Sequence, residues 1–476
     1  THNANEAAVQ SCLTEFKSQD FVKHVGAFEA GDEVVLAQID RLFGADFFAH
    51  PAVDAADHVD FEFLRALFNF GPWVVGGNFA GGDADRFGWA DEFAKLARDA
   101  AFAALLVGCQ SADTTAPAPA PKAASKAKPA PAQYVFYVGT SGAKAQGVLR
   151  CVLDGKTGKI SVPTVAAEAK SASYVALSPD AKFLYATAEA AEGAVAAYAV
   201  EGDKLRLLNT EASKGKGPTH LAVDAARKNL VVVNYGSGST TALPIKADGS
   251  LAAASSSLQH VGTGPNAGRQ SGPHAHGVYF HPKNGRAYVA DLGTDDIFIY
   301  KFDAEKGLLA ANKPKSGRVT AGEGPRHLAF HPNGKFAYVN TEMGLNVVAF
   351  SVERNGGLKQ LQSLPTLPAG AETKGASTAE IFVRPDGKTL YVSNRGHDSI
   401  AVYTIAQDGK LTLLQHMLGT PATPRGFGLS ADGRWLVCAG QKSGTLNAYK
   451  IGRDGKLTDT KQAVEAPAAA AVVFVP

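Results

Sequence analysis

From Tyr134 onward, alternating apolar and polar residues recur in a strand–turn–strand unit of the form apolar-x-P-[DN]-G-[KR]-x-x-Y-V. The residue that is usually proline serves as the anchor of each copy. At intervals of 46, 57, 50, 53 and 46 residues, the anchors are Pro179, Ala225, Pro282, Pro332, Pro385 and Ala431. Short alternating runs are typical of half-buried β-strands, and a period of about 50 residues is typical of a β-propeller with one four-stranded sheet per repeat.

Two incomplete pieces flank these six repeats. The first has three expected strands, at residues 134–139, 148–153 and 159–162, and the last, residues 471–476, places Pro476 at an anchor position. Three strands plus one complete a seventh sheet that joins the two ends and removes an open sheet edge. We therefore predict an all-β fold, a seven-bladed β-propeller over residues 134–476 closed by a C-terminal strand in the first blade.

Residues 1–98 are rich in Phe, Asp, Ala and Gly. Some segments have apolar spacing compatible with helices, but the region holds no repeat and no catalytic motif. It is either a small helical domain or sequence upstream of the true start, and it receives no functional assignment.

Residues 99–111 contain a short apolar run that ends at Cys109 and resembles a bacterial lipoprotein signal, in which that cysteine is lipidated. Asp99 inside the run weakens this interpretation, and a buried helix ending at Gly108 is the alternative. The following Pro/Ala/Lys segment, residues 112–133, cannot build a core and predicts an extended linker. A working signal would anchor the protein to a membrane at the cell envelope or in the periplasm; otherwise a cytoplasmic location is expected.

Composition narrows the function classes. Fifty glycines in 476 residues, about 10.5% against a usual share of about 7%, fit a fold with many turns. Because 47 basic and 45 acidic residues nearly cancel, nucleic acids and polybasic membrane binding are disfavoured. No apolar stretch approaches 18 residues, so no membrane-spanning helix is expected. Four cysteines are too few for a disulfide scaffold, and Cys151 and Cys438 are expected as small buried side chains.

The repeat also predicts a site. The first strand of each propeller blade lines the central channel, so its first residue and the loop after the second strand should meet at one mouth. Six residues before each anchor stand Ser173, Thr219, His276, Arg326, Ala379 and Arg425. Ten residues after each anchor stand Glu189, Tyr235, Leu292, Glu342, Arg395 and Gln441, with Asn234, Asp291 and Asn394 just before. Three arginines on one axis predict a pocket for an anionic ligand, because guanidinium groups bind carboxylate or phosphate with two hydrogen bonds.

Simpler explanations exist for these residues. Single charged side chains at loop ends often form only ion pairs at a rim, and most histidines of the repeat region are expected to cap strands or to hydrogen-bond between blades. His274 and His276 form an H-x-H pair without an evident third or fourth ligand, so no metal is expected. The glycine-rich segment 262–272 lacks a strand-to-helix context, so it predicts a long loop near the mouth rather than a dinucleotide site, and no cofactor is expected.

The region from Tyr134 to Pro476 resembles the seven-bladed propeller lactonases, which include propeller-type 6-phosphogluconolactonases and carboxymuconate cyclases. The likeness is carried by the recurrent H-P-[KN]-x-G and by residues 232–236, 273–276, 291–295, 324–327 and 393–399. The resemblance implies an enzyme, a carboxylic ester hydrolase that opens a lactone. It also implies an active-site group, which here matches His276, Arg326, Glu342 and Arg395.

Lactone hydrolysis needs a positioned water, a base and stabilisation of the tetrahedral oxyanion. His276 or Glu342 is the expected base, Arg326 and Arg395 bind the anion, and Arg425, Asn234, Tyr235, Asp291 and Asn394 are expected to contact substrate. Because no G-x-S-x-G motif is present, direct attack by water is favoured over an acyl-enzyme. We expect a small anionic lactone as the partner and a monomer or small homo-oligomer.

One alternative is a non-catalytic propeller that binds proteins or glycans at the cell envelope, since a fold does not fix a function. A quinone or haem-linked dehydrogenase is disfavoured, because the sequence has no C-x-x-C-H motif and no tryptophan at a repeated blade position.

Overall fold

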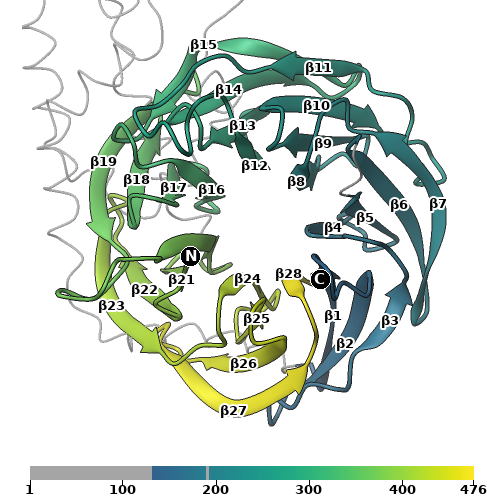
Figure 1. The fold of residues 1–476 in the computed structure, drawn as a ribbon, viewed down its shortest axis with the longest axis vertical. Coiled ribbons are helices and arrows are strands. Elements are labelled where there is room, and N and C mark those ends of the chain that lie inside the picture. The colour runs from purple at the N-terminus through teal and green to yellow at the C-terminus, as the bar shows by residue number, and fades with distance from the viewer. Residues whose placement is uncertain (1–130, 189–191) are drawn as a thin grey trace, which may run out of the picture. The chain divides into compact units, whose positions relative to one another are not determined.

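The computed structural model describes residues 131–188 and 192–476, and in these ranges the chain forms a ring of seven antiparallel sheets with four strands each (Figure 1). Figure 1 shows β4, β8, β12, β16, β24 and β28 around the central axis and the last strand of each sheet at the rim. Within the described ranges no helix is long and apolar enough to cross a membrane.

The strands follow the predicted order, from the axis outward in each blade. The closing sheet holds β28 (Ala469–Phe474), β1 (Gln133–Thr140), β2 (Val148–Asp154) and β3 (Thr164–Ala167). The next three sheets hold β4 (Val175–Leu177), β5 (Phe183–Ala188), β6 (Ala194–Glu201) and β7 (Lys204–Ala212); β8 (Pro218–Val223), β9 (Asn229–Asn234), β10 (Ser239–Pro244) and β11 (Ser256–Gln259); and β12 (Ala275–Phe280), β13 (Arg286–Asp291), β14 (Asp296–Asp303) and β15 (Leu308–Arg318). The last three hold β16 (Pro325–Phe330), β17 (Phe336–Thr341), β18 (Asn346–Val352) and β19 (Leu358–Pro365); β20 (Ser377–Val383), β21 (Thr389–Arg395), β22 (Ser399–Ile405) and β23 (Leu411–Leu418); and β24 (Pro424–Leu429), β25 (Trp435–Gly440), β26 (Thr445–Ile451) and β27 (Leu457–Glu465).

The closing sheet joins the two ends of the propeller. Strand β28 pairs antiparallel with β1, and Phe474 lies opposite Phe136 while Val472 lies opposite Val138. All four side chains are buried in one apolar cluster. The predicted seven-bladed propeller and its closure by a C-terminal strand are therefore confirmed.

One predicted strand is misplaced. The third strand of the closing sheet was expected at residues 159–162, but β3 begins at Thr164. Only a single isolated bridge, between Ile160 and Leu153, forms in the expected segment. Val162 is 79% exposed, and Pro163 has no N–H to donate, so the regular pairing with β2 starts one residue later.

Apolar clusters lie between neighbouring sheets. In one of them Tyr288 and Ile297 of one blade pack with Leu328, Val339 and Val348 of the next, and all five are buried. Burying a side chain of this size stabilises the fold by roughly 1.5–3 kcal/mol. The apolar core therefore lies between the sheets. The first residues of the innermost strands, next to the central channel, are not needed for this core and can be polar.

A repeated hydrogen bond explains the tyrosine of the sequence unit and a second Asp-Gly or Asn-Gly turn, which leads into the fourth strand of a blade. In four blades the hydroxyl of a buried second-strand tyrosine donates to a glycine carbonyl in a turn of the next blade. The pairs are Tyr185 and Gly249 at 3.0 Å, Tyr288 and Gly356 at 2.8 Å, Tyr338 and Gly409 at 3.0 Å, and Tyr391 and Gly455 at 2.8 Å. Each of these glycines has a positive φ of 79–86°, which favours glycine over residues with a Cβ.

Two histidines and two cysteines have the structural roles expected of them. The Nε2 atoms of His281 and His331 lie 2.8 and 2.9 Å from the carbonyl oxygens of Gly334 and Gly387 in the next blade. Cys151 on β2 and Cys438 on β25 are fully buried free thiols. Burial raises the pKa of Cys151 to about 12, so it stays protonated and unreactive.

Candidate active site

The two aligned sets of positions meet at a cavity of about 190 Å³. The first strands contribute its lining near their N-terminal ends, and the segments after the second strands contribute the facing wall. The lining residues are Thr219, Tyr235, Arg269, His276, Glu342, Arg395 and Arg425. Five of the predicted site residues therefore surround one cavity: His276, Glu342, Arg395, Arg425 and Tyr235.

Glu342, directly after β17, is the centre of the site. Its Oε2 accepts a hydrogen bond from Arg326 Nε at 3.0 Å and forms an ion pair with Arg395 Nη2 at 3.0 Å, and its Oε1 accepts a hydrogen bond from Arg269 Nη2 at 2.6 Å. Burial alone would raise the pKa of this carboxyl group, but the positive charges of Arg395, Arg326 and Arg269 outweigh burial and lower the pKa to about 2. Glu342 is therefore ionised across the physiological pH range.

Arg326 lies one layer behind the cavity, with 2% of its surface exposed. Its Nε is bound to Glu342, and its Nη1 donates to the carbonyl of Ala379 at 2.5 Å. The same Nη1 lies 3.2 Å from Nε2 of His327. These contacts hold the guanidinium in one orientation.

His276 stands beside this charged cluster without joining it. Its Nε2 lies 3.9 Å from Glu342 Oε2, which is beyond hydrogen-bond distance, and its Nδ1 has no hydrogen-bond partner. Burial, together with the charges of Arg326, His327 and Arg425, holds the pKa of His276 well below its ordinary value of 6.5. The imidazole is therefore neutral at pH 7 and keeps a lone pair that can accept a proton.

Arg269 is a site residue that the sequence did not single out. It belongs to the glycine-rich loop 262–272, which was predicted to lie near the mouth, and this placement is confirmed. Gln270 holds the loop, because its Nε2 donates to the carbonyl of Leu292 and to Asp295 Oδ1, both at 2.8 Å. Arg269 Nη2 also donates to the hydroxyl of Tyr235 at 3.3 Å. The composition of the loop predicted that it lies near the mouth. Arg269 itself was not predicted as a site residue, because it lies outside the aligned positions of the repeat.

Three residues that were expected to contact substrate lie outside the cavity lining. Asn234, Asp291 and Asn394 are fully buried and do not line the cavity. Asn234 Nδ2 donates to the carbonyl of Ser213, and Asp291 accepts hydrogen bonds from the backbone N–H of His274 and from the ring of His260. Asn394 Nδ2 likewise donates to the carbonyl of Thr366. These side chains hold the loops of the mouth, so their predicted contact with substrate is corrected to loop positioning.

Thr219 lines the cavity and belongs to the aligned ring, although only its larger neighbours in that ring were proposed as site residues. Its Oγ1 donates to the carbonyl of His276 at 3.4 Å, which links β8 to β12. Glu189 lies outside the described residues, as do Cys109 and the predicted segments 1–98 and 99–111 together with most of the linker.

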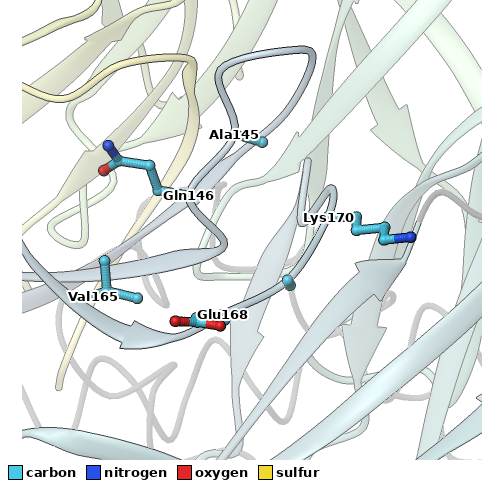
Figure 2. Close-up of a pocket in the computed structure, with 6 residues that line it drawn as sticks. Ala145, Gln146, Val165, Glu168 and Lys170 are labelled. Atoms are coloured by element: carbon cyan, nitrogen blue, oxygen red, sulfur yellow. The ribbon is translucent and has the colours of Figure 1, made fainter.

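A second, broader hollow of about 580 Å³ lies in the closing blade and the segment that follows β3 (Figure 2). It is lined by Ala145, Gln146, Val165, Glu168, Ala169 and Lys170. Figure 2 shows Glu168 and Lys170 as the two charged side chains of this hollow. Because its lining brings no acid, base and anion-binding group together, this hollow is larger than the mouth cavity but offers less chemistry.

Among residues 131–188 and 192–476, no three His, Cys, Asp or Glu side chains are arranged to hold a metal ion. His274, the other histidine of the H-x-H pair, is turned to a neighbouring loop, where its Nδ1 lies 2.9 Å from the carbonyl oxygen of Tyr235 and its ring stacks on the tyrosine ring.

Comparison with known proteins decides the family. The family model described as a lactonase with a seven-bladed β-propeller matches residues 135–474. The chain belongs to the seven-bladed β-propeller lactonase family. The predicted resemblance is thereby confirmed over nearly the whole propeller.

Named relatives agree with this lactonase assignment. The chain is 34% identical to the 6-phosphogluconolactonase of Bacillus subtilis over 301 residues, which cover 62% of this chain and 84% of the relative. It is 31% identical to a 6-phosphogluconolactonase of Formosa agariphila over 268 residues, covering 54% of this chain and 75% of the relative. The structure of a periplasmic gluconolactonase from Pseudomonas aeruginosa superposes with a TM-score of 0.68 at 28% identity and covers 72% of this chain and 99% of that one. The predicted enzyme class, a lactonase, is confirmed, and the alternative of a non-catalytic binding propeller is set aside.

Proposed function

We propose that this lactonase hydrolyses an anionic sugar lactone of the 6-phosphogluconolactone class by direct attack of water in the central mouth. The observation that carries the proposal is the charge of the cavity lining: three guanidinium groups, from Arg269, Arg395 and Arg425, surround it beside the carboxylate of Glu342, and Arg326 lies behind that carboxylate. This excess of positive charge is offset when a phosphate or carboxylate enters. The names of the relatives from Bacillus subtilis and Formosa agariphila support the same substrate class.

His276, rather than Glu342, is the base in this proposal. A carboxylate with a pKa of about 2, whose two oxygens are paired with three arginines, has little tendency to take a further proton. The neutral imidazole of His276 can take one, and the Glu342 carboxylate 3.9 Å away then stabilises the imidazolium that forms. Glu342 thus acts as the group that orients the arginines and balances the charge of His276.

The proposed reaction balances without a cofactor. The water oxygen bonds to the lactone carbonyl carbon, His276 accepts a water proton, and the carbonyl π electrons move onto the carbonyl oxygen. Collapse of this tetrahedral intermediate breaks the bond between the carbonyl carbon and the ring oxygen, and the imidazolium returns the proton to that oxygen. The acid product then releases its own proton to solvent.

Arg395 is the proposed donor to the developing oxyanion. Its Nη2 forms an ion pair with Glu342 at 3.0 Å and donates to the carbonyl of Thr378 at 3.1 Å, while its buried Nε has no hydrogen-bond partner in the structure. A donor that is fixed in place and unpaired before substrate arrives is what oxyanion stabilisation requires. Arg269 and Arg425 lie on the cavity wall and would bind the remote anionic group of the substrate.

The substrate proposal is tested by initial rates in pH-stat titration at pH 7, after subtraction of spontaneous hydrolysis. The panel comprises 6-phosphoglucono-δ-lactone, glucono-δ-lactone and δ-valerolactone, each with the wild type, Arg326→Ala and Arg206→Ala, a matched change at an exposed arginine of β7. The phosphorylated lactone should have the highest kcat/KM, and Arg326→Ala should lower it at least 100-fold while Arg206→Ala leaves it unchanged. Absence of turnover for every lactone would contradict the proposal.

We also propose that the enzyme is anchored at the cell envelope through a lipidated Cys109. The lipoprotein-like signal in residues 99–111 and the linker at 112–133 support this location. Because one relative is named a periplasmic gluconolactonase, glucono-δ-lactone without a phosphate is the second candidate substrate. Metabolic labelling of the full chain with an alkyne fatty acid should mark the wild type and not Cys109→Ser; equal labelling of both would overturn the anchor.

A further inference from the structure

A second ring of side chains lies in the channel behind the mouth residues. It consists of the next residue along each innermost strand after the aligned mouth position. Counted from the anchors, its members are Tyr174, His220, Gly277, His327, Glu380, Gly426 and Ala471. Glycine and alanine occupy three of these positions, so the fold itself does not require a polar or ionisable group there.

Glu380 of β20 is the acidic member of this ring, with 4% of its surface exposed. Its Oε1 lies 2.7 Å from His327 Nδ1 and accepts the backbone N–H of Ile381 at 3.1 Å. Its close ion-pair partner is the imidazole of His327, and the positive charges of Arg326 and Arg425 also act on it.

The hydrogen bonds continue from Glu380 to the active site. His327 presents Nδ1 to Glu380, and Nη1 of Arg326 lies 3.2 Å from its other ring nitrogen, Nε2. Nη1 of Arg326 also lies 3.4 Å from Nδ1; with the proton of a neutral His327 on Nδ1, that nitrogen donates to Glu380, and Nε2 is the ring nitrogen that can accept from Arg326. Arg326 in turn donates through Nε to Glu342. The chain of contacts therefore runs from a buried carboxyl group through an imidazole and a guanidinium to the carboxylate of the mouth.

We propose that Glu380 is a positioning residue for the lactonase reaction, which acts through His327 to fix the guanidinium of Arg326 and thereby the carboxylate of Glu342. The proposal rests on the function proposed above and names a residue that neither touches the cavity nor was singled out by the sequence.

The electrostatic surroundings give this role a pH dependence. Burial raises the pKa of Glu380 to about 8, with Arg326 and Arg425 opposing the rise. The other groups that face it are His327 and the phenols of Tyr174 and Tyr279, and His220 packs against His327 with ring centroids 5.0 Å apart. All of these are neutral at pH 7, because burial raises the pKa of both phenols and lowers the pKa of both imidazoles. A protonated, neutral Glu380 does not attract the guanidinium of Arg326, which then stays paired with Glu342. An ionised Glu380 attracts the same guanidinium and weakens its pairing with Glu342.

The test compares kcat and KM from pH 6 to pH 9 for the wild type, Glu380→Ala, Glu380→Gln and His281→Ala. The amide of Glu380→Gln keeps the acceptor for His327 and the Ile381 N–H but cannot ionise. His281→Ala removes another histidine hydrogen bond between blades, at the end of β12 away from the mouth, as a control for general loss of stability.

We expect Glu380→Ala to lower kcat at least tenfold with KM within threefold of the wild-type value, and Glu380→Gln to recover most of kcat at pH 7. The wild-type kcat should fall above about pH 8, and this fall should be absent in Glu380→Gln. His281→Ala should lower the melting temperature and leave kcat unchanged. A wild-type kcat in folded Glu380→Ala, or the same alkaline fall in Glu380→Gln, would overturn the role of Glu380. If the wild type itself opens no lactone, the proposed function fails instead, so the two failures are distinguishable.

Discussion

Arg326 Nε lies 3.0 Å from Glu342 Oε2, and both side chains are almost completely buried. Arg326 lies on β16 and Glu342 directly after the adjacent strand β17, sixteen positions apart along the chain. Because Arg395 and Arg269 from two other parts of the chain pair with the same carboxylate, this pair fixes the geometry of the whole mouth.

Replacing Glu342 by glutamine should damage both stability and activity. Three guanidinium groups would lose their common anion, and removal of one partner of a buried ion pair typically costs about 3–5 kcal/mol. We expect the free energy of unfolding in urea to fall by about that amount and kcat/KM to fall at least 100-fold. Glu305→Gln, at an exposed carboxylate paired with Lys228, is the matched control and should change neither quantity. Wild-type kcat/KM in Glu342→Gln would show that the arginines hold their positions without it.

Arg269→Ala should separate binding from chemistry. The side chain reaches the cavity from a loop and does not touch the proposed base, so we expect a rise in KM for 6-phosphoglucono-δ-lactone and a kcat within threefold of wild type. A hydrogen bond to a charged group is worth about 1.5–3 kcal/mol, which corresponds to roughly a 10- to 100-fold rise. KM for glucono-δ-lactone should change much less. An equal rise for both lactones would place Arg269 away from the phosphate.

The melting temperature should be highest near pH 6.5. Burial lowers the pKa of His220, His276 and His327 well below 6.5 in the folded protein, so the unfolded chain binds more protons below that pH and stability is lost as the pH falls. Glu380 acts oppositely: its folded pKa of about 8 lies above the unfolded value, so its contribution is lost as the pH rises toward 8. Calorimetry from pH 5 to pH 8.5 checks both limbs. Glu380→Gln should lack the decline between pH 6.5 and 8, and a decline of wild-type size in that variant would refute the assignment.

Phe474→Ala should weaken the closure of the ring. Phe474 packs on Phe136 with ring centroids 5.1 Å apart, and its truncation leaves a cavity between β28 and β1. Losses for a buried phenylalanine are about 3–5 kcal/mol, measured as the free energy of unfolding in urea. Leu413→Ala, at a leucine that is 48% exposed on β23, should stay within about 0.5 kcal/mol of wild type. Equal stability of both variants would mean that the closing strand contributes little.

The sequence predicted the fold because the repeat combines two independent signals. Alternation sets the strands, and the tyrosine of the unit marks a hydrogen bond that recurs between blades, made to a glycine in the turn before the fourth strand of the next blade, as between Tyr338 and Gly409. The error at β3 arose where the closing blade departs from the repeat. There, the residues around Ile160 have the sequence pattern of a strand but form only one isolated bridge. Regular pairing begins after Pro163.

The site was predictable as far as it follows the repeat. Counting from the anchors located His276, Arg326, Glu342 and Arg395, because the blades repeat the same strand order, but it did not show that Arg326 lies behind the cavity that the other three line. It could not identify Arg269, which lies in a loop outside the repeat, or tell that Asp291 turns inward to the His274 N–H and His260 instead of toward the cavity. Such orientations depend on contacts between blades that spacing along one chain does not contain.

The most direct test of the central claim is the kcat of His276→Ala for 6-phosphoglucono-δ-lactone, measured by pH-stat titration beside His331→Ala, a histidine that only bridges two blades. General base catalysis contributes roughly 10²–10⁴-fold to rate. We predict a loss of that size for His276→Ala, with a melting curve close to that of the wild type, and an unchanged kcat for His331→Ala. Full retention of kcat in His276→Ala would contradict the account and remove His276 from the mechanism.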